Sequence, residues 1–313
     1  MGSLTVHKLP IIDFTKENLK PGTSSWLTAR HAVTHALEEY GCFIAIYDKI
    51  SSELHDAVFR SLEQLFDLPT ATKVQNKSSK PLYGYVGQIP IIPLYESLGI
   101  DYPNTPQGIQ SFTNVMWPHG NDAFSESLLS YSKVAAELEQ LAVKMVFESY
   151  GVEKYYESYQ SSANYLCRVM KYREPQPNET NKGFVSHTDK NFMTVLHQNQ
   201  INGLEIKAKD GEFFGVDYLP QSFVVMAGDA IMAWSNGRIQ SPHHRVTMNG
   251  NAARYSLAQF SFMQGNKVQT PEELVDEEHP LLFNPFDHLD FLKFYSEGNN
   301  RYLECPIRTY CGV

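Results

Sequence analysis

The sequence predicts a mainly β fold with added helices, in which a β-rich core in the second half of the chain is flanked by N-terminal and C-terminal helical segments. Two patterns of residues in the sequence lead to this prediction. Before about residue 160, long segments repeat apolar residues at helical intervals. After about residue 163, short β-rich runs are separated by Gly, Asn, Asp and Pro, which is typical of an antiparallel barrel or sandwich. A jelly roll with a site in its mouth is one such architecture.

The N-terminal part alternates strand and helix signals. KLPIIDF (8–14) and GCFIAIYD (41–48) are short apolar runs, as strands are. Helices are predicted where apolar residues recur every three or four positions, and the first two also begin behind Ser or Thr and end before Gly or Pro. These helices are 23–41, 51–69 and 122–151. The last is the longest, and it carries an apolar stripe that a core would cover: Leu128, Tyr131, Ala135, Leu138, Ala142 and Met145.

The β-rich part is followed by a shorter helical tail. Its runs are CRVMKY, MTVLHQ, GLEIKA, SFVVMAGDAIMAW, HHRVTM and RYSLAQFSFM. The tail contains PFDHLDFLKFYSEGNN (285–300), which has a helical pattern. We therefore predict a helix-rich N-terminal region (1–160), a catalytic core (161–270) and a C-terminal helical tail (271–313), packed as one unit.

Bulk composition excludes several classes of partner. The 313 residues include 35 acidic and 26 basic side chains, for a net charge of -9, and no Lys/Arg-rich run. This argues against nucleic acid or an anionic membrane surface as a partner. No stretch has the length of a membrane span, and the start lacks an apolar signal segment. The four cysteines form no CxxC pair, which suits a reduced compartment. We expect a cytoplasmic monomer that acts on a small molecule.

A candidate metal site begins with His187 and Asp189, two positions apart in a run that otherwise has the pattern of a strand. Residues at i and i+2 of a strand point the same way, so both side chains would converge. A third ligand is offered by His243 or His244, the latter 55 residues after Asp189. Two histidines and one carboxylate form the facial triad of non-haem Fe(II) oxygenases. Zinc hydrolases also use His and carboxylate ligands, so the set alone does not choose the metal.

A second signal favours an oxygenase. Ten residues after His244 stands Arg254, and Ser256 shares its strand face. A guanidinium fork matches a carboxylate, and the serine adds a hydroxyl donor. A cation held beside a metal site inside a barrel calls for an anionic co-substrate, whereas without the triad Arg254 would be an ordinary surface charge.

The motif order H-x-D, H-R-V and R-x-S resembles the plant 2-oxoglutarate- and Fe(II)-dependent dioxygenases. LPIIDF, SFVVMAGD, SNGR and EELVDEEHPLLFNPF extend the resemblance over nearly the whole chain. HTDKNFMTVLHQNQINGLEI and DEEHPLLF are most similar to a sub-branch with glucosinolate-modifying dioxygenases, steroidal glycoalkaloid hydroxylases and deoxypodophyllotoxin synthase. The resemblance implies a double-stranded β-helix, or jelly-roll, core.

The resemblance also implies roles for particular residues. The implied iron ligands are His187, Asp189 and His244, with His243 as the extra histidine. Arg254, Ser256 and Tyr172 match the residues that hold the distal carboxylate of 2-oxoglutarate. Two positions before that tyrosine the family often has Asn, whereas this chain has Met170.

The implied activity is a dioxygenase reaction that consumes O2 and 2-oxoglutarate, with Fe(II) as cofactor and ascorbate as reductant. It would oxidise an unactivated C–H of a plant specialised metabolite by hydroxylation, desaturation or ring closure, releasing succinate and CO2. A hormone-catabolic dioxygenase acting on auxin or gibberellin is the alternative. That reading requires a second cation for the carboxylate of the substrate, and the segments of the expected pocket supply none.

An apolar pocket would suit a terpenoid, polycyclic or phenolic substrate. Its candidate wall residues are Phe112, Met116, Phe184, Phe260 and Phe262. An ordinary role in the core is an equal alternative for each of them. The sequence leaves open which way His197 faces on its strand. A ligand-binding protein without turnover and a metal-dependent hydrolase are the remaining alternatives, and the combined metal and co-substrate motifs argue against both.

Overall fold

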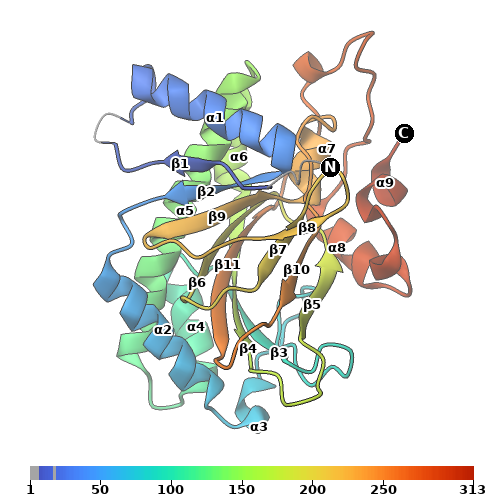
Figure 1. Ribbon diagram of the computed structural model, residues 1–313. Coiled ribbons are helices and arrows are strands. Elements are labelled where there is room, and N and C mark those ends of the chain that lie inside the picture. Colours follow the sequence, from blue (N-terminus) through green and yellow to red (C-terminus); the bar gives the residue numbers. More distant parts are fainter. Residues whose placement is uncertain (1–6, 17–18) are drawn as a thin grey trace, which may run out of the picture.

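The structure is a computed structural model that describes residues 7–16 and 19–313. Two β-sheets face each other, and a layer of helices covers the far side of the larger sheet (Figure 1). The C-terminal helices lie at the opposite end of the molecule from α2. Within the described residues no helix combines the length and apolarity that a membrane crossing needs. The predicted mainly β fold with a jelly-roll core is confirmed.

The major sheet has seven strands. In spatial order they are β1 (Ile11–Asp13), β2 (Cys42–Ile46), β9 (Ser222–Ala227), β6 (Met193–Gln198), β11 (Arg254–Met263), β4 (Ala163–Tyr172) and β3 (Tyr95–Asp101). The minor sheet has the order β5 (Lys182–His187), β10 (His244–Thr247), β7 (Leu204–Lys207) and β8 (Phe213–Gly215). Neighbouring strands are antiparallel except for β1 and β2.

The three helices predicted in the first half of the chain are present as α1, α2 and α5, and further helices join them. Together they are α1 (Ser24–Tyr40), α2 (Ser52–Phe66), α3 (Thr70–Lys73), α4 (Pro106–Met116), α5 (Asp122–Ser149) and α6 (Tyr156–Ser162), then α7 (Asp229–Trp234), α8 (His288–Ser296) and α9 (Pro306–Cys311). Short 3-10 turns are Glu153–Tyr155, Glu272–Leu274 and Asn300–Tyr302. Helix α5 is the centre of the layer, because it contacts α1, α2 and α4 as well as β6 and β11.

The ends of α1 show why the sequence predicts this helix well. The Thr23 side chain accepts a hydrogen bond from the Trp26 amide, which satisfies one free N–H of the first turn. Gly41 ends the helix at φ 69°, and its amide donates to Leu37 O. A Cβ at Gly41 would lie 2.4 Å from Gln240 O, so the position also needs the absence of a side chain.

Several elements differ from the sequence prediction. The run 222–234 was expected to be one strand, but it forms strand β9 and then helix α7. The change occurs at Gly228, where the backbone passes close to Asn191. A Cβ at Gly228 would lie 2.0 Å from Asn191 O. Strand β3 and helix α4 were not predicted at all. Strands β1, β2 and β3 come from the N-terminal region and complete the major sheet, while the three-part division of the chain stays a prediction.

The central strands β4, β6 and β11 have two different faces. Val195, Cys167 and Leu257 point outward and join the core shared with the helices. Their neighbours in the chain point inward, toward the minor sheet, and among them Leu196 and Ala258 belong to a second core inside the roll. We call these the outer face and the inner face. Because strand side chains alternate, one strand serves both the stability core and the candidate site.

Candidate metal and co-substrate site

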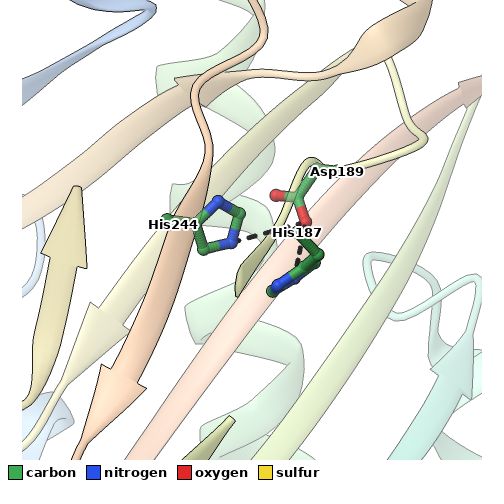
Figure 2. A group of neighbouring side chains, drawn as sticks. All are labelled: His187, Asp189 and His244. Atoms are coloured by element: carbon green, nitrogen blue, oxygen red, sulfur yellow. Dashed lines mark ion pairs between the residues drawn. The ribbon is translucent and has the colours of Figure 1, made fainter. Parts of the chain in front are cut away.

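Three potential metal ligands meet inside the roll. His187 ends β5 and His244 begins β10, and the two residues are direct partners across these antiparallel strands. Each histidine places Nε2 3.7 Å from Asp189 Oδ1 (Figure 2). One ligand atom from each of the three residues lies within 4.8 Å of the others. The sequence prediction that these three side chains converge is therefore confirmed as geometry.

The reason for the convergence differs from the one that the sequence suggested. Strand β5 stops at His187, and Asp189 lies in the turn that follows, so strand alternation does not align the pair. Hydrogen bonds from elsewhere hold the turn: Thr194 Oγ1 donates to Asp189 Oδ2 at 2.6 Å. The backbone N–H of Asp229, at the start of α7, donates to Asp189 O at 2.7 Å. A fixed carboxylate leaves Oδ1 aimed at the two histidines.

Both imidazoles are prepared to bind a metal through Nε2. His187 Nδ1 lies 2.9 Å from Val185 O, and His244 Nδ1 lies 3.2 Å from Pro242 O. A carbonyl can only accept, so each Nδ1 carries the proton and each Nε2 keeps its lone pair. Burial lowers the pKa of His187, and His244 lowers it further, so the ring is neutral as a ligand must be. Two histidines and one carboxylate match the donor set of non-haem iron, with positions left open.

A buried ion pair fastens the same turn. Lys190 Nζ lies 2.6 Å from Asp229 Oδ2 and 2.9 Å from Thr188 O. Lys190 O is also 2.9 Å from His288 Nε2, on helix α8. The chain next to Asp189 is thus bonded to helices α7 and α8, which keeps this candidate ligand in place.

A buried guanidinium lies deeper on the inner face. Arg254 is 0% exposed, and its Nη groups donate to Ser256 Oγ at 3.1 Å and to Gln198 Oε1 at 2.6 Å. Its Nε has no acceptor among the described residues, and none of their carboxylates pairs with it. A buried cation with a spare donor and no counter-charge fits an anionic co-substrate, so the residues suit 2-oxoglutarate.

Tyr172 stands opposite Arg254 on β4. The guanidinium lies 5.1 Å from the centre of the tyrosine ring, a cation–π distance. The Tyr172 hydroxyl is 3.6 Å from the sulfur of Met170, a weak acceptor that occupies the place of the usual asparagine. Burial raises the pKa of Tyr172, so the phenol stays protonated and keeps its donor.

The five predicted wall residues separate into two groups. Phe184 packs its ring 4.9 Å from that of His187, and half-buried Phe260 lies on the inner face. Phe262 is on the same face, but Tyr83 and His288 cover it. The structure does not bring Phe112 and Met116 to the triad. Both join the core of the helical layer, where Phe112 stacks on Phe124.

Four residues escaped the sequence prediction: Thr194, Gln198 and Arg168 on the inner face, and Lys190 in the loop before β6. Thr194, Gln198 and Lys190 act through partners that the chain supplies from other segments. Arg168 could have been found, because it lies four residues before Tyr172 on one strand and so shares its face. His197 faces outward, where its ring forms a hydrogen bond with His55, so it is not part of the candidate site.

Comparison with known proteins adds independent findings. Residues 163–262 match the sequence profile of the 2OG-Fe(II) oxygenase superfamily, and residues 9–106 match that of the non-haem dioxygenase in morphine synthesis N-terminal region. A probable 2-oxoglutarate-dependent dioxygenase AOP1.2 from Arabidopsis thaliana is 44% identical over 310 residues, which are 97% of this chain and 95% of the relative.

Two solved structures are similar over most of the chain. The dioxygenase for auxin oxidation from rice superposes with a TM-score of 0.79 at 30% identity, covering 92% of this chain and 95% of the other. The Arabidopsis thaliana dioxygenase for auxin oxidation 1, in a binary complex with 2-oxoglutarate, gives a TM-score of 0.78 at 28% identity, with coverage of 87% and 100%.

Proposed function

Since the chain belongs to the 2OG-Fe(II) oxygenase superfamily and is a 2-oxoglutarate-dependent dioxygenase, we propose which of its residues form the reaction centre. His187, Asp189 and His244 would hold Fe(II). Arg254 and Ser256, assisted by Tyr172, would hold the distal carboxylate of 2-oxoglutarate. Two neighbouring features support this proposal. The three candidate ligand atoms lie within 4.8 Å of one another, and the same roll contains the fully buried Arg254, which no carboxylate of the described chain neutralises.

When bound, Fe(II) and 2-oxoglutarate supply the oxidising chemistry: O2 is consumed, 2-oxoglutarate becomes succinate and CO2, and a C–H of the substrate is oxidised. The chain supplies placement. Thr194 orients Asp189, two backbone carbonyls orient the histidines, and Gln198 orients the guanidinium. Ascorbate would keep the metal reduced.

The proposed substrate is a plant specialised metabolite that is hydroxylated, desaturated or closed into a ring. Phe184 and Phe260 give the wall near the metal an aromatic character, which favours a substrate with an apolar body. We further propose a cytoplasmic monomer. In support, all four cysteines are free, which suits a reducing compartment.

The test of the reaction centre is an anaerobic titration of Fe(II) and 2-oxoglutarate into the purified protein, followed by the visible charge-transfer band of the chelate. We expect the band in the wild type, its loss in His244→Ala, and a large rise in the 2-oxoglutarate concentration needed in Arg254→Met. A full band in His244→Ala would remove that histidine from the ligand set.

A second candidate function is the oxidation of a hormone-type carboxylate. It is favoured by the likeness to the rice dioxygenase for auxin oxidation, at 30% identity. A panel of specialised metabolites and indole or diterpenoid acids, assayed for succinate release, separates the two candidates.

A further inference from the structure

The described residues contain four buried lysine and arginine side chains: Lys73, Arg168, Lys190 and Arg254. The two lysines are each neutralised by a carboxylate, Glu96 for the first and Asp229 for the second. Neither arginine forms an ion pair within the described chain. Arg254 has the co-substrate as its proposed counter-charge, which leaves one buried cation, Arg168, without an assigned anion.

Arg168 points into the roll from β4. It is 9% exposed and lies opposite Ala258 of β11, on the inner face that also carries Arg254. Four residues of a strand separate Ala258 from Arg254, which is roughly 13 Å. The two arginine side chains therefore start from different depths along the same wall.

The partners of Arg168 are all neutral. Nη1 donates to Ser97 Oγ at 2.7 Å, and Nη2 donates to the carbonyls of Leu82 and of Gly84, the latter at 3.2 Å. Carbonyl and hydroxyl dipoles hold the guanidinium in place, but they do not cancel its charge. An uncompensated buried charge is costly, and a bound anion would remove that cost.

Tyr95 connects this cation to the metal side of the roll. Its ring lies 4.6 Å from that of Phe184, which in turn contacts the ring of His187. Burial raises the pKa of Tyr95; of the charges nearby, Arg168 lowers that pKa and Asp189 raises it. The Tyr95 ring thus packs on Phe184, which lies beside His187, and the phenol remains a hydroxyl donor. Half-buried Phe260, two residues from Ala258, adds an apolar surface on the same face.

We propose that Arg168, together with the hydroxyls of Tyr95 and Ser97, binds an anionic group of the substrate. A carboxylate fits best, because a planar guanidinium and two hydroxyl groups match its oxygens, and a sulfate ester shares the same chemistry. The substrate is then an apolar body with one anionic group, not a wholly apolar molecule. This inference rests on the proposed function, since it assumes a reaction centre beside the triad.

The experiment compares charged and neutral forms of the same body. Wild-type protein loaded with 2-oxoglutarate and redox-inert Mn(II) is titrated with indole-3-acetate, 3-phenylpropionate and 4-octylphenyl sulfate, and with the methyl ester or parent alcohol of each. We expect at least one anion to bind about tenfold to a hundredfold more tightly than its neutral analogue, as a charge-assisted hydrogen bond provides. If no anion is preferred, the proposal is overturned.

Variants then assign the preference to the side chain. Arg168→Gln keeps an N–H donor for the two carbonyls but loses the charge, so the preference should vanish. Arg168→Lys keeps the charge and should retain part of it. Arg173→Gln is the matched control, because Arg173 follows the same strand but is paired with Glu179 at the surface. An unchanged preference in Arg168→Gln would refute the proposal.

Binding of Mn(II) and 2-oxoglutarate is measured in every variant. It should persist in Arg168→Gln, which shows that the fold and the proposed reaction centre are intact. If the wild type binds neither, the proposed function fails. If both bind and the anion preference is absent, only the anion site fails. A preference for the sulfate over both carboxylates would identify a sulfate ester as the ligand.

Discussion

The two faces of the central strands treat buried polar groups in opposite ways. On the outer face, Glu139 accepts hydrogen bonds from the hydroxyls of Tyr159 and Tyr165, and His197 bonds to His55 and to Ser222 O. On the inner face, Arg254 and Arg168 have no carboxylate partner in the described chain. The carboxyl group and the histidine pair of the outer face thus have partners within the chain, whereas the two guanidiniums of the inner face have no counter-charge among the described residues. The difference separates residues that stabilise the fold from residues that serve the reaction.

The largest effect is expected at the candidate metal ligands. Asp189→Ala removes the only carboxylate of the triad, so turnover with any substrate should fall to background, while the free energy of unfolding of the metal-free protein stays close to that of the wild type. Succinate release measures the turnover, and urea unfolding measures the free energy of unfolding. Turnover near the wild-type level would show that the reaction centre lies elsewhere.

The next effect concerns the co-substrate. Arg254→Met should raise the KM for 2-oxoglutarate by about a hundredfold, since a charge-assisted contact is lost. Gln198→Ala should raise it by about tenfold, because it removes only the acceptor that orients the guanidinium. Removing an uncompensated charge should not lower the free energy of unfolding without ligand, and it can raise it. If Arg254→Met lowers the free energy of unfolding and leaves the KM for 2-oxoglutarate unchanged, Arg254 stabilises the fold and does not bind the co-substrate.

Tyr159→Phe tests the outer face. The change deletes the hydroxyl that donates to Glu139 and lies 3.2 Å from Ser261 Oγ, and it leaves a buried carboxylate short of a donor. The free energy of unfolding should fall by about 1–3 kcal/mol. The KM for 2-oxoglutarate should not change. Equal stability in urea would show that the network adds nothing to the fold.

The smallest effect is a pH dependence carried by the histidine pair. Burial lowers the pKa of His197 to about 3. Burial also lowers the pKa of His55, whereas the charge of Asp56 raises it. Between the unfolded value near 6.5 and pH 3 the unfolded chain binds more protons, so stability is lost as the pH falls through that window. His197 alone should remove about 2 kcal/mol between pH 7 and pH 5.

The slope of unfolding free energy against pH is the measurement. His197→Gln should flatten it between pH 7 and pH 5, and a variant of the exposed His31 serves as the control for replacing a histidine as such. If the slope is the same in His197→Gln, other groups carry the acid sensitivity.

Particular residues show how far sequence could go. His187, His244, Arg254 and Ser256 were predicted as a group, and the structure brings the two histidines together with Asp189. The reason given for Asp189 was wrong, because strand β5 ends before it and long-range hydrogen bonds place it. Phe112 and Met116 were expected near the substrate, but their apolar character fits a helix core equally well, and α5 covers them.

The sequence by itself determined what is local: which residues can bind a metal or an anion, where helices begin and end, and which positions alternate along a strand. Only the tertiary structure decided which buried charges are neutralised. Asp229 reaches Lys190 from 39 residues away and Glu96 reaches Lys73 from 23, whereas no carboxylate of the described chain reaches Arg168 or Arg254. Counter-charges come from distant segments, so the cations left for ligands become visible only when the chain is folded.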